Sequence, residues 1–239
     1  MSDFTTWRSL VDGEEIGVIP DSVESHWPVG SDDTSTATDT VGDIDLAVNG
    51  PTLVTDSDSA DGHHYSLDGS DYLGLDDTDD DEIFKNLDEF TMLLWVLAED
   101  DQEFEFRFFG HMDNDGSGSA SNNSWMISVV DSEDWRVQIS DEVVFSGDYT
   151  NDILTAEWLL LTLRFDEGSM DLLKNDANEI DSGTASASNT GDNGDQFAIG
   201  SHPNGDGGLI GDVDFGGWAQ TAISDEDITQ YYNAHPRSD

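Results

Sequence analysis

The middle of the chain reads Trp158-Leu-Leu-Leu-Thr-Leu-Arg-Phe-Asp-Glu-Gly-Ser-Met-Asp-Leu-Leu-Lys-Asn-Asp-Ala-Asn-Glu-Ile180. Every second residue from Leu159 to Phe165 is apolar. Because alternate residues of a β-strand share a face, these side chains point to one side. The opposite face, which includes Leu160, is partly apolar too. A run this short, bounded by turn residues, cannot form a buried helix, so it predicts a strand that is covered on both faces.

Turn residues follow this strand. Gly168 lies within Asp-Glu-Gly-Ser, residues 166–169, where glycine can take a positive φ. A second strand is expected at residues 170–174, and Asn175 and Asp176 then offer another tight turn. Two successive hairpins around a strand that is apolar on both sides predict a place in the middle of a packed β-sandwich.

The rest of the chain repeats this pattern of short strands and turns. Further strands are expected near residues 23–30, 46–54, 65–75, 90–97, 104–108, 125–130, 135–139, 143–145, 196–200 and 211–218. One helix is expected after Ser224, which can cap it with Asp227 three residues further on. We therefore predict an all-β fold, a two-sheet antiparallel β-sandwich (jelly roll) with one short C-terminal helix.

The first residues do not join this pattern. We predict an N-terminal arm at residues 1–21, closed by Pro20, and a single jelly-roll domain at residues 22–239. One all-β domain of this length is ordinary, so length alone does not demand a second domain.

The charge of the chain is extreme. It has 54 acidic and 7 basic residues, and its formal net charge is −47. Such a charge strains a compact fold through self-repulsion, which largely vanishes at molar salt, where the screening length is about 3 Å. Recurring Trp, Phe and Leu argue against an acidic disordered protein, and acids in nearly every loop argue against a nucleic-acid mimic. We expect a halophilic source and no contact with nucleic acid.

Cysteine is absent, so neither disulfides nor thiolate metal sites are available. The start of the chain lacks the basic and apolar regions of a secretory signal peptide. No run approaches the length of a membrane span, so no membrane insertion is expected. We expect either a complete mature chain or a protein that leaves the cell without a signal peptide of its own.

Nine short motifs occur along the chain in an order that a known family shares. They are His26-Trp-Pro-Val29, Asp39-Thr-Val-Gly42, Leu46-Ala-Val-Asn-Gly50, Leu67-Asp-Gly-Ser-Asp-Tyr72, Phe90-Thr91 through Trp95-Val96, Trp158 through Asp166, Met170 through Asn175, Phe197-Ala-Ile-Gly-Ser201, and Gly211-Asp-Val-Asp214 with the helix that follows. Over these residues the chain resembles the laminin-G-like jelly roll of the concanavalin-A-like lectin/glucanase superfamily. Lys174 and Gly216-Gly217 depart from the apolar residues usual in that family, which leaves the pairing at the sheet edges open.

The resemblance raises the question of catalysis. Glucanases of the superfamily carry paired acids on one strand, in a pattern close to Glu-x-Asp-x-x-Glu, to flank the scissile bond. Glu103 and Glu105 share a face here, but they alternate with phenylalanines, which favours a solvent-facing side, and no third acid follows at the family spacing. We expect no enzyme activity; a divergent glycosidase is kept as the second alternative.

Calcium is the one cofactor that the sequence suggests. Asp113 and Asp115, with Ser117-Gly118, resemble the first half of a calcium loop, but Ser124 stands where the twelfth-position Glu is needed. A solvated loop is the alternative. The resemblance further implies a calcium ion at the rim of the sandwich, with Asp39 and Asp214 as metal ligands; Asp214 could equally accept backbone hydrogen bonds at a strand end.

Sugar binding would need aromatic faces and planar polar groups. Trp125 and Trp135 start or flank strands beside the loop at residues 110–123, so with Asp113 and Asp115 they are the candidate ligand-binding residues. The alternative for both tryptophans is a place in the core.

The expected function is non-catalytic surface recognition and assembly in high salt. The first hypothesis is a virion structural component of a halophilic archaeal virus, such as a capsid decoration, turret or tail spike. Its partners would be further copies of itself, other virion proteins and host-surface glycan, and its location the virion surface or the extracellular space. The alternative is a glycan-binding module of a halophile cell-surface or secreted protein.

Overall fold

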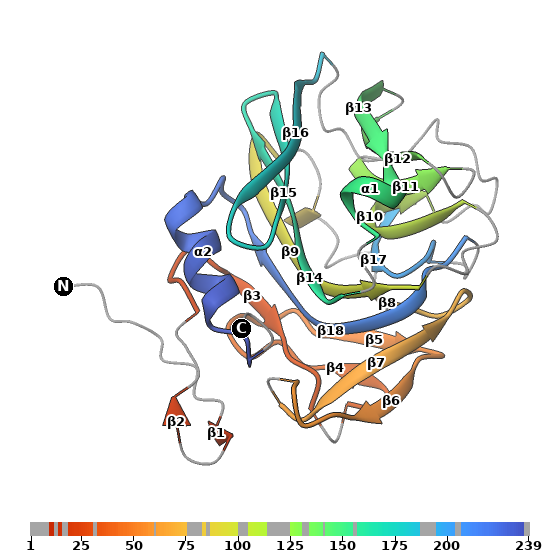
Figure 1. Cartoon of the computed structure of the whole chain (residues 1–239), viewed down its shortest axis with the longest axis vertical. Helices are drawn as coiled ribbons and strands as arrows, with labels where there is room; N and C mark the ends of the chain where they lie inside the picture. The colour runs from red at the N-terminus through yellow and green to blue at the C-terminus, as the bar shows by residue number, and fades with distance from the viewer. Residues whose placement is uncertain are drawn as a thin grey trace.

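The computed structural model describes residues 10–11, 14–15, 19–30, 33–59, 61–75, 83–84, 87–99, 105–113, 125–130, 134–140, 142–154, 157–186, 195–203 and 207–236. Two antiparallel sheets face each other, and this confirms the predicted sandwich (Figure 1). Each sheet is named here after a central strand, as the β9 sheet and the β10 sheet.

The β10 sheet runs β13 (Glu142–Asp148), β12 (Asp134–Ile139), β11 (Trp125–Val130), β10 (Phe106–Asp113), β17 (Asp195–Ile199), β8 (Tyr72–Gly74), β5 (Leu46–Asn49) and β4 (Thr36–Ala37). The β9 sheet runs β16 (Asn178–Thr184), β15 (Ser169–Lys174), β14 (Leu159–Asp166), β9 (Glu89–Ala98), β18 (Ile210–Ala219), β7 (His63–Asp68) and β6 (Thr52–Thr55), and β3 (Ser25–Trp27) also pairs with β18. The order mixes strands distant in sequence, as a jelly roll requires.

The run that begins at Trp158 forms the predicted central hairpin. Strand β14 pairs with β9 on one side and β15 on the other. Its turn to β15 places Gly168 at φ 98°, and the next turn places Asn175 at φ 54°, in the left-handed region that these residues tolerate. The local sequence therefore sets both turns.

The main core fills the space between the sheets. Every second residue of β14, from Leu159 to Phe165, is buried there. Aromatic rings from both sheets meet in this layer, with Trp125 and Trp218 stacked at a centroid distance of 5.6 Å. Burial of such side chains is the dominant favourable term for the fold.

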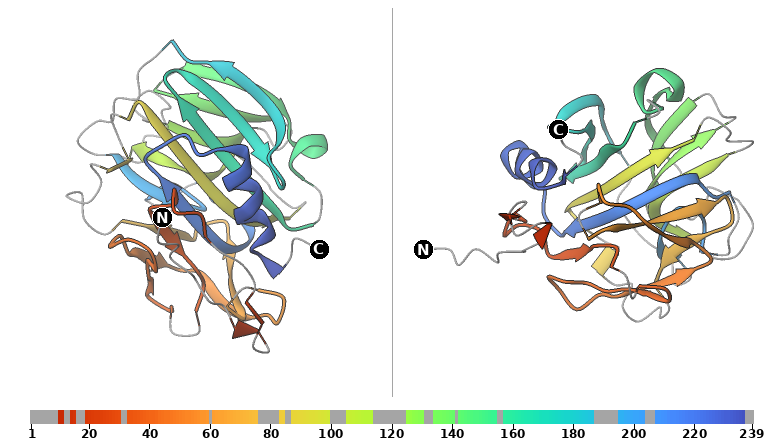
Figure 2. Two further views of the ribbon diagram at one scale, coloured as in Figure 1. Left: turned by 90° about the vertical axis from the view of Figure 1, so that its left-hand side faces the viewer. Right: turned by 60° about the horizontal axis from the view of Figure 1, so that its bottom comes forward.

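A second apolar layer lies on the outer face of the β9 sheet. Helix α2 (Asp225–Asn233) crosses this face, as Figures 1 and 2 show. Leu160 and Trp95 from the sheet pack there with Ile228 and Tyr231 from the helix. This layer explains why β14 is apolar on both sides.

The family departures in the last strand have a packing reason. A Cβ on Gly217 would lie 2.6 Å from the hydroxyl oxygen of Tyr231. Glycine in β18 therefore lets α2 approach the sheet closely. Lys174, the other departure, donates from Nζ to the carbonyl oxygen of Asp152 at 2.7 Å.

Helix α2 begins as predicted. The Ser224 side chain accepts a hydrogen bond from the Asp227 backbone N–H. A short helix that was not predicted, α1 (Tyr149–Asp152), follows β13 and is capped by Asp148. A helix of one turn has no hydrophobic periodicity long enough to predict it from sequence.

The N-terminal part contains a small two-stranded sheet, β1 (Leu10–Val11) and β2 (Glu14–Glu15). Ile19 and Val23 are buried in the second apolar layer. The boundary predicted at residue 21 stays a prediction. Within the described ranges, no helix has the length and apolar character needed to cross a membrane.

Candidate functional site

The two tryptophans predicted to bind sugar are core residues. Trp125 and Trp135 are 0% and 1% exposed, and both belong to the layer between the sheets. Their indole N–H groups donate to the Phe84 carbonyl oxygen at 2.7 Å and to Asp152 Oδ2 at 2.9 Å. Neither ring has a face open to a sugar, so this prediction is wrong. The core alternative holds because both rings point inward from their strands.

The predicted calcium loop lies mostly outside the described residues. The backbone of Asp113 ends β10 opposite Asp195, and Asp115 falls outside the described ranges. Glu103 falls outside them too, whereas Glu105 is described. The ligand roles of Asp113 and Asp115 stay predictions.

Asp39 organises the loop after β4. Its Oδ1 accepts hydrogen bonds from the backbone N–H groups of His26, Val41 and Gly42 at 2.8–3.0 Å. Its Oδ2 accepts one from the Ile44 N–H at 3.1 Å. Four backbone donors thus contact the carboxylate, which gives Asp39 a structural role in this loop, and its role as a metal ligand stays a prediction.

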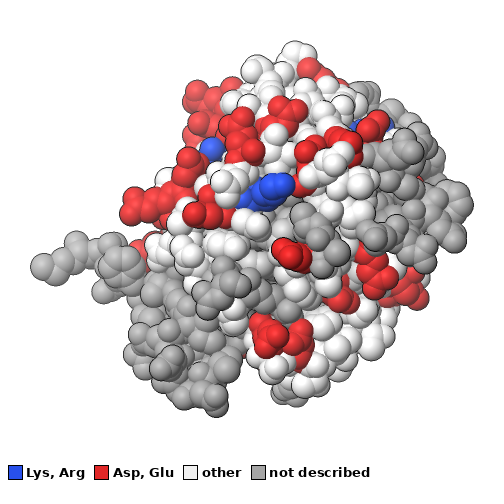
Figure 3. Space-filling view, viewed as in Figure 1, with Lys and Arg blue, Asp and Glu red and all other residues white. Residues whose placement is uncertain are grey.

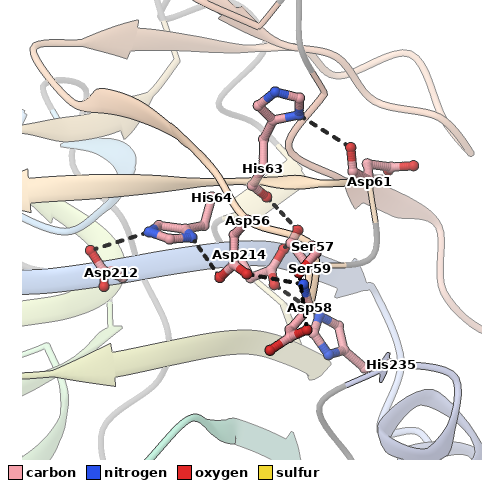
Figure 4. Close-up of polar contacts among 10 residues, drawn as sticks. All are labelled: Asp56, Ser57, Asp58, Ser59, Asp61, His63, His64, Asp212, Asp214 and His235. Atoms are coloured by element: carbon pink, nitrogen blue, oxygen red, sulfur yellow. Dashed lines mark hydrogen bonds and ion pairs between the residues drawn. The ribbon is translucent and has the colours of Figure 1, made fainter. Parts of the chain in front are cut away.

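Asp214 is held by side chains from two distant parts of the chain, Ser59 and His235 (Figure 4). Its Oδ1 accepts from Ser59 Oγ at 2.6 Å, and its Oδ2 lies 3.1 Å from His235 Nε2. All three residues are at most 1% exposed. Asp214 lies between the serine and the histidine, so no histidine is placed to activate the hydroxyl as in a Ser–His–Asp triad. The group instead joins the 56–62 turn to the segment after α2.

His26 lies close to this group and is itself buried. Burial lowers its pKa from 6.5 to about 3, although the negative charge of Asp39 opposes that shift. The ring makes edge contacts with Phe215 and Tyr231. A neutral imidazole is therefore part of the packing under α2.

The turn between β6 and β7 is rich in acids. His64 lies 3.2 Å from Asp56 and 3.7 Å from Asp212. Asp61 is exposed at the surface yet crowded by protein atoms; this desolvation, and then the charges of Asp214 and Asp33, raise its pKa to about 6. Among the residues that the structure describes, no three His, Asp or Glu side chains converge to hold a metal ion.

A different set of polar side chains lies on the outer face of the β10 sheet. Trp135, Val137 and Ile139 of β12 point into the core, so Arg136 and Gln138 point away from it. The strand register places Ser128 and Ser146 on either side of Arg136, and Val143 beside Gln138. We call Glu105, Ser128, Arg136, Gln138, Val143 and Ser146 the polar patch.

Arg136 is the central cation of the polar patch. Its Nη2 donates to Glu105 Oε1 at 2.6 Å, and its Nε donates to Ser128 Oγ at 3.3 Å. The Arg136 side chain keeps 23% of its surface exposed, and that of Glu105 keeps 36%. Arg107 Nη2 also contacts Glu105 Oε1, at 3.4 Å. Within the described residues, Nη1 of Arg136 and Oε2 of Glu105 have no hydrogen-bond partner.

Gln138 adds a buried acceptor next to this cation. The residue is 2% exposed, and its Oε1 has no hydrogen-bond partner in the described part of the chain. A buried, unpaired carbonyl oxygen costs about 1–3 kcal/mol. Val143 beside it is 46% exposed. The polar patch therefore combines unused donors and acceptors with a small apolar surface.

The family model of the concanavalin A-like lectin/glucanases superfamily matches residues 67–229. The chain belongs to this superfamily. The match spans β8 to the first residues of α2 and so contains every residue of the polar patch.

Solved structures share the fold of this chain. Domain 4 of AbnA, an extracellular arabinanase from Geobacillus stearothermophilus solved with arabinotriose, is 19% identical with a TM-score of 0.63, and the alignment covers 87% of this chain and 97% of that domain. The Trypanosoma rangeli sialidase with the inhibitor DANA is 13% identical with a TM-score of 0.66, over 90% of this chain and 33% of the sialidase. At such identities the likeness establishes the fold.

A receptor-binding domain is similar as well. The receptor binding domain of the botulinum neurotoxin C/D mosaic serotype is 17% identical with a TM-score of 0.62, over 89% of this chain and 51% of that domain. The chain thus spans a third of the sialidase and about half of the toxin domain. No protein with a curated description matches this chain.

Proposed function

We propose that this superfamily member is a non-catalytic carbohydrate-recognition module that binds sugar at the polar patch. The observation that carries the proposal is the partly exposed pair of Arg136 and Glu105, in which Nη1 and Oε2 have no hydrogen-bond partner within the described residues. Guanidinium, carboxylate and amide groups are planar and match the hydroxyl groups of sugars in direction. A few placed polar groups beside apolar surface are typical of ligand sites.

The arabinanase domain supports this proposal. That domain was solved with arabinotriose, and this chain spans nearly all of it. Hydrolysis is not proposed, because a retaining glycosidase needs two carboxyl groups about 5–5.5 Å apart and a water to attack the intermediate. Glu105 instead contacts two arginines at its Oε1.

The proposed working medium is concentrated salt. The net charge is −47, and acidic side chains spread over the face shown in Figure 3 while basic ones are few. Screening at molar salt removes most of the repulsion among them. Binding should therefore be measured in about 3 M KCl.

The assembly role stays part of the proposal. In the first version of this proposal, the module is displayed on the virion of a virus that infects a halophilic archaeon, and it contacts host glycan. In the alternative, it belongs to a secreted or cell-surface protein of a halophile. The buried Ile19 supports a packing role for the N-terminal segment. The oligomeric mass of the full chain in about 3 M KCl tests it: a discrete oligomer supports assembly, and a monomer contradicts it. A bound calcium ion stays a prediction, tested by adding a chelator to the same sample.

The test of sugar binding compares the native chain with Arg136→Leu. Calorimetric titration with arabinotriose and other neutral oligosaccharides should show binding that weakens at least about tenfold in the variant, from the loss of charge-assisted hydrogen bonds. Reducing ends of the oligosaccharides should not accumulate during incubation with the chain, because no hydrolysis is proposed. Unchanged binding by Arg136→Leu would place the sugar elsewhere, and release of reducing ends would revive the glycosidase alternative.

A further inference from the structure

We infer that strand β6 is a docking edge at which two copies of this chain pair, antiparallel to each other and about a two-fold axis at Val54. This inference names the partner and the surface for the proposed assembly role, on which it rests, and it does not depend on sugar binding at the polar patch. It follows from how the edges of the two sheets differ and from which backbone groups β6 turns outward.

The exposed edges of the two large sheets differ in how they are guarded against a further strand. Charged side chains, bulges and short length all hinder an edge strand from pairing with another chain. Strand β4 has two residues. Strands β13 and β16 each have a register shift against their neighbour and two acidic residues, Glu142 with Asp148 and Glu179 with Asp181. Strand β6, at the edge of the β9 sheet in Figure 1, has neither a charged residue nor a register shift.

The ladder between β6 and β7 shows which backbone groups of β6 face away from the sheet. In the register of that ladder, the Asp56 N–H donates to the Gly62 carbonyl oxygen at 2.8 Å. Hydrogen-bonded and non-hydrogen-bonded pairs alternate along an antiparallel ladder, so the odd-numbered Leu53 and Thr55 turn their N–H and C=O groups outward. Pro51, which has no N–H, has the same phase, and an edge tolerates proline there. Within the described residues, no strand pairs with this side of β6.

A second copy of β6 matches these outward groups. With a two-fold axis at Val54, Leu53 of each copy lies opposite Thr55 of the other, and each of these pairs exchanges two backbone hydrogen bonds. Val54 then lies opposite its own counterpart. The Leu53 side chain packs against the main core, so that of Val54 points to the outer face of the sheet. Pairs of β-branched side chains across strands are favourable, so the outer face adds to the contact.

The charge of the chain favours a copy of β6 as the occupant. The side chains of β6 are uncharged, so they offer no carboxylate to select a basic peptide. Two copies of a chain of −47 repel each other in dilute buffer, but at molar salt the screening length falls to about 3 Å. The contact is small, so we expect a weak dimer, which many copies on one surface would strengthen through avidity.

Disulfide formation tests the pairing directly, because the chain contains no cysteine. Opposite residues of a non-hydrogen-bonded antiparallel pair have Cα atoms about 4.5 Å apart, within the range that a disulfide spans. Val54→Cys should therefore form a covalent dimer when oxidised with diamide in about 3 M KCl. Thr52→Cys is the matched control, on the same face and more exposed. Its two copies would lie about 13 Å apart along the strand, so it should stay monomeric on a non-reducing gel.

The outcomes separate this inference from the assembly role. Cross-linking of Thr52→Cys as fast as that of Val54→Cys overturns the inference, because random collision would then explain both. A native chain that forms a discrete oligomer, while Val54→Cys forms no disulfide, overturns the inference and leaves the assembly role standing. A native chain that stays monomeric at every concentration overturns both.

A second pair of variants tests the contact without a covalent bond. Val54→Asp places two carboxylates opposite each other at the two-fold axis and should weaken the dimer at least about tenfold. Ser182→Asp, in the edge strand β16 at the other side of the same sheet, is the matched control and should leave the dimer unchanged. Sedimentation over a series of concentrations in about 3 M KCl measures both, and the unfolding midpoint checks that both variants are folded. Equal dimerisation of the native chain and folded Val54→Asp would overturn the inference.

Discussion

Two arginines of this chain sit on opposite sheets in contrasting surroundings. Arg164 of β14 donates from Nε and Nη2 to Asp171 and from Nη1 to Asp225 and to the Ile223 carbonyl oxygen. Every nitrogen of its guanidinium is used. Arg136 of β12 uses Nε and Nη2 and leaves Nη1 without a partner in the described residues. Their side-chain exposures are similar, 19% and 23%, so access to solvent does not separate them.

The difference lies in what each cation joins. Arg164 ties the β14–β15 hairpin to the start of α2 and so closes the second apolar layer. Within the described residues, Arg136 bonds to Ser128 of β11 and to Glu105, which directly precedes β10. Of the 7 basic residues in the chain, Arg164 holds two elements together, whereas Arg136 keeps a donor group that no described residue uses. We infer stability from the first and recognition from the second.

The largest expected effect concerns acid and the α2 side. The folded pKa of His26 is about 3, against an ordinary 6.5, because burial disfavours the charged ring. The unfolded chain therefore takes up a proton that the folded chain refuses as pH falls from 6.5 towards 3. The stability contributed by neutral His26 is fully present above pH 6.5 and is lost across that window, on the order of 5 kcal/mol.

Asp61 works in the opposite direction. Its raised folded pKa, about 6, makes the folded chain hold its proton more tightly, so its contribution declines as pH rises from 3.8 to 6. Urea unfolding of the native chain and of His26→Gln, measured against pH in about 3 M KCl, separates the contribution of His26 from that of Asp61. The variant should lose the steep acid slope, and His63→Gln, a half-buried control, should keep it. Equal slopes in the native chain and His26→Gln would contradict the prediction.

The next largest effect concerns the hydrogen bonds that Arg164 makes between the β14–β15 hairpin and the start of α2. Arg164→Leu should lower the free energy of unfolding by about 2 kcal/mol, because Asp171 and Asp225 lose their shared cation and a carbonyl oxygen loses its donor. Partial exposure of both pairs keeps the loss below that of a fully buried pair. Urea unfolding measures it. A loss under about 0.5 kcal/mol would show that the hydrogen bonds of Arg164 do not stabilise the fold.

The region around Arg164, with the β14 hairpin and the start of α2, was the more predictable of the two from sequence. The β14 hairpin follows from a period of two with a glycine turn, and the start of α2 follows from Ser224 and Asp227. Both signals are local in sequence. That β14 is apolar on both faces even predicted a second covering layer, which α2 supplies.

The polar patch could not be found in this way. The alternation of Trp135, Arg136 and Val137 fixes which side chains share a face, but the pairing of β10, β11 and β12 decides their neighbours. Glu105 reaches Arg136 across 31 positions of sequence. The same alternation places Trp135 in the core, whereas position beside a loop had suggested a sugar contact. Ser59 and Asp214 are 155 positions apart, beyond any local motif.

A smaller effect sharpens the account of α2. Ser224→Ala removes the acceptor for the Asp227 N–H and should cost about 1 kcal/mol. Ser224→Asp keeps an acceptor at the same place and should cost little. Thermal unfolding in about 3 M KCl compares both with the native chain. Equal losses in the two variants would mean that the cap does not limit stability.

The smallest expected effect is the stability of Arg136→Leu, and it decides the comparison. Glu105 keeps its contact with Arg107, and partly exposed ion pairs contribute little, so the free energy of unfolding should change by less than about 0.5 kcal/mol. Sugar binding should nevertheless fall at least about tenfold in the same sample. Arg164→Leu should show the reverse: a stability loss with binding intact. If both variants lost stability equally and neither lost binding, the two arginines would have one role, and recognition would have to be sought on another surface.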